Sequence, residues 1–383
     1  MSGPPDGMPD GPDAAASTIT VSVTSTADLR LIAFRDGPSA PWQTPAATAP
    51  GRYQFMVHGP YTVLDVCAAQ ETVVEFARSR TPDDPREFVM SCLTPSPPQG
   101  SHVTGSITLL PGTAESTHVH IGPSAISSPM PDGTFDVEVG DGTYDLTVRT
   151  LSSTASQDRT VIRRNVVVTG DTVVMPAIDV ATEGTAAVLV QPTVTNLGVD
   201  ERTIMTSEVH TPTVTTGVSL IGGVGFHVLP DAALGPGDFQ RIALTGNTSH
   251  DLMSFSGRTV DRLYTETTSL EFTLPPAISA PYTVIDGQAV ATWTTLPPFD
   301  RLRFTVGQDV ANSAGLLPLQ VTELSASYVT AVGATSARFD TDVPGFDPSW
   351  RIDVTLAWDH EAEALRTVGG ELLSSSQFEE IVL

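Results

Sequence analysis

The stretch PDGTFDVEVGDGTYDLTVR, residues 131–149, decides the fold class of this chain. Two Asp-Gly-Thr-aromatic units each begin a run of alternating apolar and polar residues, which is typical of a strand with one buried face. Between the runs, Gly140-Asp141-Gly142 can supply the positive φ angles of a tight turn, and Asp132-Gly133 marks another turn. The pattern therefore predicts an antiparallel hairpin. The residues expected on its buried faces are Phe135, Val137, Val139, Tyr144, Leu146 and Val148, and those expected on its solvent faces are Asp136, Glu138, Asp145 and Thr147.

The rest of the chain has the composition of many short strands and turns. Of its 383 residues, 40% are hydrophobic, and 31 Gly and 31 Pro separate the apolar runs. The length predicts roughly two to four domains of about 100 residues each. We therefore expect an all-β fold of tandem antiparallel β-sandwich domains. The strongest helical candidate, DHEAEAL at residues 359–365, is too short to be stable alone.

The net charge of -25 limits the partners of the protein. Nucleic acids and anionic membranes are bound through basic patches that displace counterions, so the acidic balance predicts neither as a partner. All 19 basic residues are Arg, because the sequence contains no Lys.

Two cysteines occur, Cys67 and Cys92, each near the end of an apolar run. An even pair suggests a disulfide, which would stabilise its domain by about 3 to 4 kcal/mol in the chain-entropy model. The alternative is two buried free thiols, because spacing alone does not establish pairing. If the bond forms, the compartment is oxidising.

Residues 1–17, MSGPPDGMPDGPDAAAS, predict a disordered acidic tether, because this Pro/Asp/Gly segment has nothing to bury. We expect neither a signal peptide nor a transmembrane segment, since no apolar run approaches about 18 residues. The segment resembles the linker that follows the lipidated cysteine in many bacterial surface lipoproteins. The resemblance implies an extracytoplasmic protein, at the bacterial outer surface or in the periplasm, held to a membrane only through a removed or absent N-terminal lipid anchor. The alternative is a disordered tail on a cytosolic protein.

Residues 18–95 predict an N-terminal β-sandwich, with strands at ITVSVTS, LRLIAF, RYQFMV, YTVLDVC, VVEFA and EFVM. Trp42 lies in the turn-rich stretch PSAPWQTPAATAPG, where we expect it to plug the end of the sandwich. The sequence AFRDGPSAPWQ, followed by RYQFMV and a strand that ends in cysteine, looks like the leading domain of a group of bacterial surface proteins with no assigned activity.

Residues 100–180 predict a second β-sandwich. Its strands VTGSITLL, THVHIG, DGTFDVEV, GTYDLTV and NVVVTGDTVVMPAI follow in an order that resembles the carboxypeptidase regulatory-like (transthyretin-like) domain. Members of that family commonly carry a DG-x-aromatic turn and a GxYxLxV strand. The resemblance covers about 80 residues and implies a fold rather than a function, because this module serves as a spacer, a stabilising appendage or a sugar-binding relative.

Residues 181–276 predict a third sandwich, and residues 277–383 a fourth. In the fourth, AVATWTTLPPFDRLRFTVGQ is similar to the paired central strands of a fibronectin type III domain, with Trp293 in the place of the core tryptophan. The similarity ends after Val306.

His118 and His120 are the candidate metal ligands. They flank Val119 on a predicted strand, which puts both imidazoles on one face and about 7 Å apart at the α-carbons. His102 could lie on a neighbouring strand, but no third ligand is apparent, and such pairs are also common on solvent faces. We therefore expect no bound metal and no cofactor.

A cluster of acidic residues in the predicted hairpin could hold calcium, although turn formation and a wet strand face also explain these residues. The cluster consists of Asp132, Asp136, Glu138, Asp141 and Asp145.

These patterns predict a non-catalytic structural or binding protein whose partner is an unknown protein or glycan at the cell surface. A glycan-binding module is the alternative, and it requires an exposed aromatic platform. The candidates for that platform are Trp350, Trp358, Tyr264 and Tyr282. A second alternative is a subunit of a surface assembly, with an unpaired edge strand such as the closing segment at residues 379–383.

Overall fold

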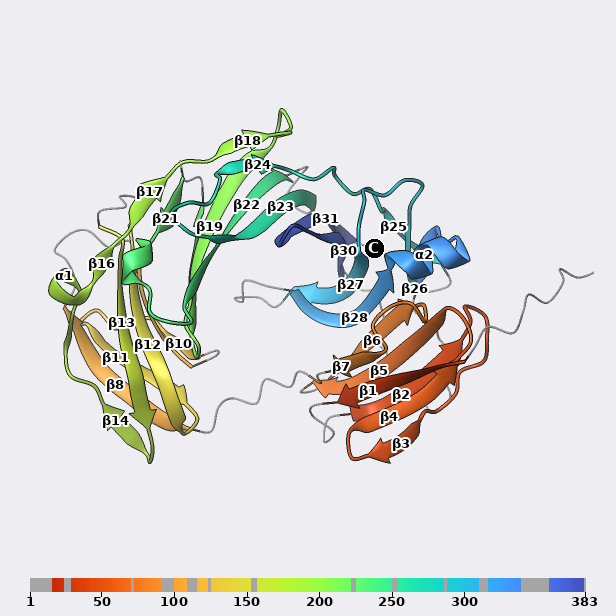
Figure 1. Cartoon of the computed structure of the whole chain (residues 1–383), viewed down its shortest axis with the longest axis horizontal. Coiled ribbons are helices and arrows are strands. Elements are labelled where there is room, and N and C mark those ends of the chain that lie inside the picture. The colour runs from red at the N-terminus through yellow and green to blue at the C-terminus, as the bar shows by residue number, and fades with distance from the viewer. Residues whose placement is uncertain are drawn as a thin grey trace, which may run out of the picture.

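The computed structural model consists of strands with two short α-helices and one 3-10 helix in its described part, and the predicted all-β fold class is confirmed (Figure 1). Most of the predicted tether at residues 1–17 lies outside the described residues. The structure describes residues 16–23, 29–69, 72–90, 92, 100–108, 116–122, 125–152, 157–221, 225–249, 254–285, 288–309, 316–338 and 358–381.

One eleven-stranded sheet runs through most of the molecule. Its strands come from distant parts of the chain, and all neighbours are antiparallel except β6 and β28, which are parallel. In spatial order the sheet comprises β2 (Leu29–Asp36), β5 (Tyr61–Ala69), β6 (Thr72–Arg80), β28 (Leu316–Ser325), β27 (Arg301–Asp309), β30 (Trp358–Val368), β31 (Glu371–Ile381), β23 (Ser254–Tyr264), β22 (Phe239–Ser249), β19 (Arg202–His210) and β20 (Thr215–Ile221).

Smaller sheets cover this sheet or pack on one another. In the first 187 residues they are β3 (Ala46–Ala49), β4 (Arg52–Val57), β1 (Ser17–Val23) and β7 (Glu87–Met90); β10 (Ala125–Ser127), β9 (Ser116–Ile121), β12 (Gly142–Leu151), β13 (Arg159–Val168) and β16 (Thr185–Ala186); and β11 (Thr134–Val139), β8 (Ser101–Thr108) and β14 (Thr172–Val174), with β15 (Ile178–Asp179) also on β8. Beyond them lie the pair β17 (Val188–Val190) and β21 (Phe226–Val228), the pair β18 (Thr193–Thr195) and β24 (Glu271–Thr273), and the sheet β25 (Tyr282–Ile285), β26 (Gln288–Thr292) and β29 (Ser336–Arg338). The helices are α1 (Val180–Glu183), η1 (Asp231–Ala233) and α2 (Ala326–Val332).

Four buried apolar clusters define four sandwich-like units, which we call the first (β1–β7), second (β8–β16), third (β17–β24) and fourth (β25–β31) unit. In the first unit, Phe34 stacks on Phe55 with ring centroids 4.2 Å apart. In the fourth, Trp293 is buried and stacks on Phe304 at 5.3 Å. Each unit buries its own apolar faces, and this burial is the main force that holds a strand-rich unit together.

The units do not follow one another in space as they do in sequence. The first unit pairs with the fourth through β6 and β28, and the fourth pairs with the third through β31 and β23. The second unit contacts the third through β12 and β20. Figure 1 accordingly shows an arch with the second unit at one end and the first unit at the other. The chain therefore differs from a linear array, in which the first unit would adjoin the second.

The predicted hairpin at residues 131–149 is wrong in its pairing. Both runs are strands, but β11 pairs with β8, whereas β12 pairs with β9 and β13 in the opposite sheet. The segment Gly140-Asp141-Gly142 thus crosses between sheets, and it has no positive φ angle. Val137 and Leu146 belong to one core cluster, so the two apolar faces meet across the core instead of lying side by side.

The turn at Asp132-Gly133 is present, and its glycine has a positive φ angle. Gly133 has a φ angle of 83°, and a Cβ there would lie 2.5 Å from the Ile107 carbonyl oxygen. Only glycine fits both requirements.

The strongest helical candidate of the sequence, residues 359–365, which is too short to be stable alone, lies in β30, near the middle of the eleven-stranded sheet. Its sequence alternates: Ala362 and Ala364 are buried against the fourth core, and pairing with β27 and β31 overrides local helix propensity. The longer helix is instead α2, which the Ser325 hydroxyl caps by accepting a hydrogen bond from the Tyr328 N–H at 3.2 Å.

The closing segment begins at a residue that is paired on both sides and so is not at a free edge there. Glu379 pairs with Ser254 of β23 on one side and with His360 of β30 on the other. Strand addition is therefore blocked at Glu379, whereas Glu380 and Ile381 are paired only with β30 among the described residues.

Candidate functional site

Cys67 and Cys92 form a disulfide in the core of the first unit, with α-carbons 5.2 Å apart. The bond ties β5 to the residue two places after β7. Asp65, on the same strand face as Cys67, is fully buried and accepts a hydrogen bond from Arg78 at 2.7 Å. Burial raises the pKa of Asp65 to about 6, and the neighbouring Arg78 guanidinium opposes part of this rise.

His118 and His120 project from the same face of β9, as the alternation predicts, while Val119 points into the core. Their ring centroids are 6.3 Å apart. His102 is not a strand neighbour: it lies on β8 in the opposite sheet, and its Nδ1 is 2.8 Å from Asp136 Oδ1. Within the described ranges, no group of three or more His, Cys, Asp or Glu side chains could hold a metal ion.

The acidic residues of the predicted hairpin do not converge on one point. Each has a different protein partner in the structure. These are Thr134 for Asp132, His102 for Asp136, the Gly100 N–H for Glu138, Ser101 for Asp141 and Arg164 for Asp145.

The outer face of β12 is buried, although its polar residues predicted a solvent face. Thr147 is fully buried and Asp145 is 7% exposed, because the third unit covers them. The Thr147 hydroxyl hydrogen-bonds the hydroxyl of Thr216 on β20, and the Asp145 N–H donates to Thr213 Oγ1 at 2.7 Å. The polar residues of this face therefore form an interface between units.

At the centre of this interface lies a group of polar side chains that we call the buried charge cluster: Arg149, Asp158, Ser207 and His227. Arg149 donates to the Ser207 carbonyl at 3.0 Å and to Asp158 Oδ2 at 3.4 Å. His227 Nδ1 lies 3.0 Å from the same carboxylate oxygen. All four side chains are at least nine-tenths buried. Sequence reasoning missed the cluster because its members are far apart along the chain and each looks like a surface residue on its own.

The cluster also affects His120. The pKa of His120 is lowered to about 4, mainly by burial and in smaller part by the nearby His118 and Arg149. The unfolded chain takes up this proton below a pH of about 6.5, whereas the folded chain does so only near 4. The folded state is therefore destabilised as the pH falls from about 6.5 towards 4.

We expect the His120→Gln variant to lose less stability on acidification than the natural protein, by about 2 kcal/mol between about pH 7 and pH 4.5. The full shift corresponds to roughly 3 kcal/mol, and the partial solvent contact of the ring reduces it. Hydrogen exchange of β9 and β12 amides measures the local free energy of opening. His102→Gln is the control. The hydrogen bond to Asp136 raises the pKa of this exposed histidine. His102 therefore stabilises the folded state as the pH falls, and its replacement should change the pH dependence of stability in the opposite direction. Equal pH dependence of His120→Gln and the natural protein would contradict the assignment.

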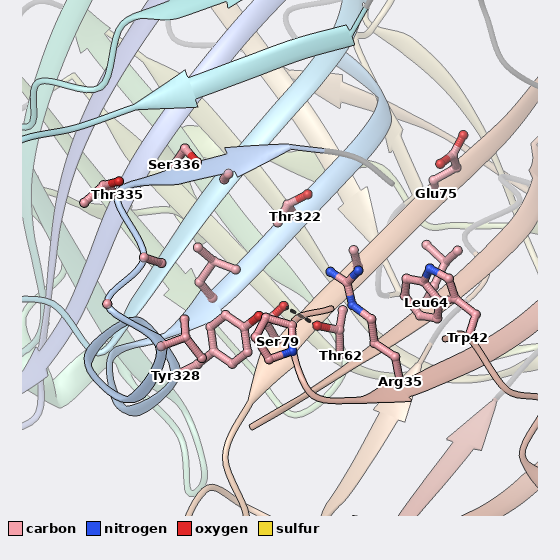
Figure 2. A pocket seen from close by; sticks show the side chains of 17 residues that line it. Arg35, Trp42, Thr62, Leu64, Glu75, Ser79, Thr322, Tyr328, Thr335 and Ser336 are labelled. Carbon is pink, nitrogen blue, oxygen red and sulfur yellow. Dashed lines mark hydrogen bonds between the residues drawn. The ribbon is translucent and has the colours of Figure 1, made fainter. Parts of the chain in front are cut away.

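A cavity of about 360 Å³, which we call the seam cavity, lies where the first and fourth units meet (Figure 2). Its floor is one face of the continuous sheet, where Ala77 of β6 lies beside Thr322 of β28 and Ser79 lies beside Leu324. In the first unit this face is opposite the core, whereas in the fourth unit Leu324 belongs to the core. Trp42 of the first unit forms one wall. The other wall consists of α2, which carries Tyr328, and the segment that follows this helix. Neither unit makes this cavity alone.

Polar groups face the seam cavity from several strands. The Thr62 and Ser79 hydroxyls hydrogen-bond each other at 2.9 Å on the floor. The Glu75 carboxylate accepts from Gln320 Nε2 at 3.3 Å and is 2% exposed. Thr322 is 4% exposed, and its Oγ1 has no hydrogen-bond partner among the described residues.

Trp42 does not plug the end of the sandwich. It packs on Leu64, on the sheet face opposite the first core, and the Arg35 guanidinium lies 4.9 Å from its ring centroid. Its buried indole Nε1 has no partner in the part of the chain that the structure describes. Figure 2 shows Arg35 and Trp42 beside Thr62 and Leu64 at one side of the cavity.

The predicted aromatic platform is not formed by its tyrosines. Tyr264 is 6% exposed in the third core, and Tyr282 packs edge-to-face on Phe304 in the fourth. Trp350 and the side chain of Trp358 lie outside the described residues. The two tyrosines therefore offer no exposed aromatic platform.

No helix in the described ranges is both long and apolar enough to cross a lipid bilayer. No protein-family model matches the chain, and a comparison with the curated proteins finds no match.

Proposed function

We propose that this chain is a non-catalytic structural or binding protein that works outside the cytoplasm, tethered to the bacterial surface through its N-terminal region. The observation that carries the location is the Cys67–Cys92 disulfide, because such bonds form and persist in oxidising compartments. The buried position of the bond in the first core favours a structural role over a redox role.

The structural part of the proposal rests on how the units are joined. Two of the three junctions are continuous hydrogen-bonded strand pairs, β6 with β28 and β31 with β23, and the third contains the buried charge cluster. Such junctions restrict relative motion far more than flexible linkers do. We propose that the arch presents its surfaces in a fixed geometry to a protein or glycan partner.

We also propose that the second unit is a carboxypeptidase regulatory-like domain, and that the fourth is related to fibronectin type III domains. The strand sequence of the second unit and the buried Trp293 of the fourth support these relationships. Neither domain type by itself specifies a ligand.

The location is tested by trapping the thiol state in growing cells of the source organism. Cells are quenched in acid, free thiols are blocked, disulfides are then reduced, and the new thiols are labelled with a polyethylene glycol maleimide. We expect both cysteines to carry the label, and a Cys67→Ala/Cys92→Ala variant to carry none. Cysteines that are already blocked as free thiols in the first step would overturn the proposed compartment.

The alternative of a glycan-binding protein is favoured by one specific observation, the seam cavity with its tryptophan wall and hydroxyl floor. It is compatible with the structural proposal, since the cavity exists only where two units are held together.

A further inference from the structure

A second cavity lies between the third and fourth units, and we call it the proline groove because Pro275, Pro276, Pro297 and Pro298 line it. Its floor is the part of β30 and β31 next to the turn that joins them, and β24 with the segment after it forms one wall. Its volume of about 500 Å³ is within the range for small-molecule sites. No residue lines both this groove and the seam cavity, so the groove is a separate candidate site.

The wall at residues 271–276 is held in place through its backbone. Four of its carbonyl groups each accept a hydrogen bond from a side chain, at distances between 2.5 and 3.1 Å. The pairs are Glu271 with Arg262, Leu274 with Asn196, Pro275 with Arg258 and Pro276 with Ser375. A surface that is fixed in this way loses little conformational freedom when a ligand binds.

Four charged side chains line the groove, and two of them neutralise each other. Arg262 is buried, and its guanidinium lies 3.2 Å from the Glu371 carboxylate. Arg366 and Glu271 are exposed, and neither side chain has a hydrogen bond or an ion pair with another described residue. The groove therefore offers one cation and one anion that a ligand can reach and that have no competing partner among the described residues.

This pair of charges favours a ligand that carries both signs. An anion would pair with Arg366 but would also meet the negative charge of Glu271, and a cation would meet the opposite conflict. A zwitterion satisfies both groups, because a guanidinium donates paired hydrogen bonds to a carboxylate and a carboxylate accepts them from an ammonium group.

The remaining surface of the groove favours an apolar ligand body. Val368 is 43% exposed on the floor, and Leu373 beside it is partly buried. The proline rings add rigid apolar surface without N–H donors. Burial of apolar ligand groups against this surface removes both from water. A single amino acid is small for the groove, whereas a short peptide has the same two terminal charges and fills more of it.

We propose that the proline groove binds a short apolar peptide with free termini, whose carboxylate pairs with Arg366 and whose ammonium group pairs with Glu271. This inference goes beyond the proposed function, which assigns no ligand to this groove, and it does not depend on the location outside the cytoplasm. A purified protein that binds no peptide leaves the thiol experiment unaffected, and free thiols in cells leave peptide binding unaffected.

The test uses the full chain with leucine, dileucine and trileucine, and calorimetry measures the binding of each. The length of the peptide sets the separation of its two charges, so we expect dileucine or trileucine to bind more tightly than leucine. An amide at the C-terminus or an acetyl group at the N-terminus of that peptide should each weaken binding about tenfold, because each removes one charged hydrogen-bonding group.

Two variants assign the charges to their partners. Arg366→Gln should weaken binding of the free peptide about tenfold and abolish the effect of the amide, while the effect of the acetyl group remains. Glu271→Gln should abolish the effect of the acetyl group and keep that of the amide. Both variants replace exposed side chains without described partners, so the fold is retained.

Arg202→Gln is the matched control. Arg202 is also exposed, but it lies on β19 and does not line the groove, so this variant should bind the peptide as the natural protein does. Three results would overturn the proposal: neither dileucine nor trileucine binds, a capped peptide binds as tightly as the free one, or the Arg366 and Glu271 variants keep the natural preference for free termini.

Discussion

Replacing Asp158 by alanine is expected to destabilise the protein by about 3–5 kcal/mol, the cost of leaving a buried charge without its partner. Asp158 is fully buried and Arg149 is 3% exposed, so no solvent compensates the guanidinium once the carboxylate is gone. His227 loses the acceptor of its Nδ1 proton at the same time. Urea unfolding followed by far-UV circular dichroism measures the loss, and hydrogen exchange should show it at β12, β19 and β21.

The double variant Asp158→Ala/Arg149→Met separates a lost ion pair from a general packing defect. Because it removes the unpaired charge, it should recover a large part of the lost stability. Glu87→Ala is the control for simple loss of a carboxylate, since Glu87 contacts Arg52 at 4.0 Å on the surface, and we expect a change within about 0.5 kcal/mol. If Asp158→Ala costs less than about 1 kcal/mol, or the double variant is no more stable than the single one, the cluster does not hold the second and third units together.

The Cys67→Ala/Cys92→Ala variant is expected to lose about 3–4 kcal/mol, because the disulfide closes a loop with a sequence separation of 25. The loss should be local to the first unit, where both sulfurs lie in the core. Hydrogen exchange should therefore increase in β5 and β7, while β12 and β13 of the second unit keep their protection.

A reductant provides the matched control for the cysteine variant. Dithiothreitol should lower the stability of the natural protein towards that of the double variant and leave the variant unchanged. If the variant unfolds at the same urea concentration as the oxidised natural protein, the bond contributes no stability. If the second unit loses protection as strongly as the first, the effect is not local.

Strand existence was well predicted by alternation, but strand partners were not. The burial pattern of β11, with Val137 inside and Asp136 outside, follows the sequence closely. The same kind of pattern in β12 cannot distinguish a hairpin from two strands in opposite sheets, because both arrangements bury the same side chains and need a turn at Gly140-Asp141-Gly142. The choice depends on contacts between β12 and β9, which lie more than 20 residues apart in sequence.

The parallel pairing of β6 with β28 had no local signal either. Gln320 lies beside Glu75 although 245 positions separate them in sequence. The seam cavity depends on this pairing, so its lining could not be assembled from spacing. Trp42 was visible as an unusual residue in a turn-rich segment, but only the fold brings it onto the sheet face near Thr322.

Polar residues on β12 show the main limit of pattern reading. Thr147 and Arg149 have the composition of a solvent face, and in an isolated unit they would form one. The third unit covers them and supplies their hydrogen bonds. Burial between units therefore leaves no apolar signature when the interface is polar.

The central claim, a protein displayed outside the cytoplasm, is tested most directly by antibody binding to intact cells of the source organism, before and after treatment with a broad-specificity protease. Amine-reactive surface labels are unsuitable because the sequence has no Lys. We predict that the antibody binds intact cells and that protease removes this signal while a cytoplasmic marker is retained. Antibody binding only after lysis, together with free Cys67 and Cys92, would contradict the account.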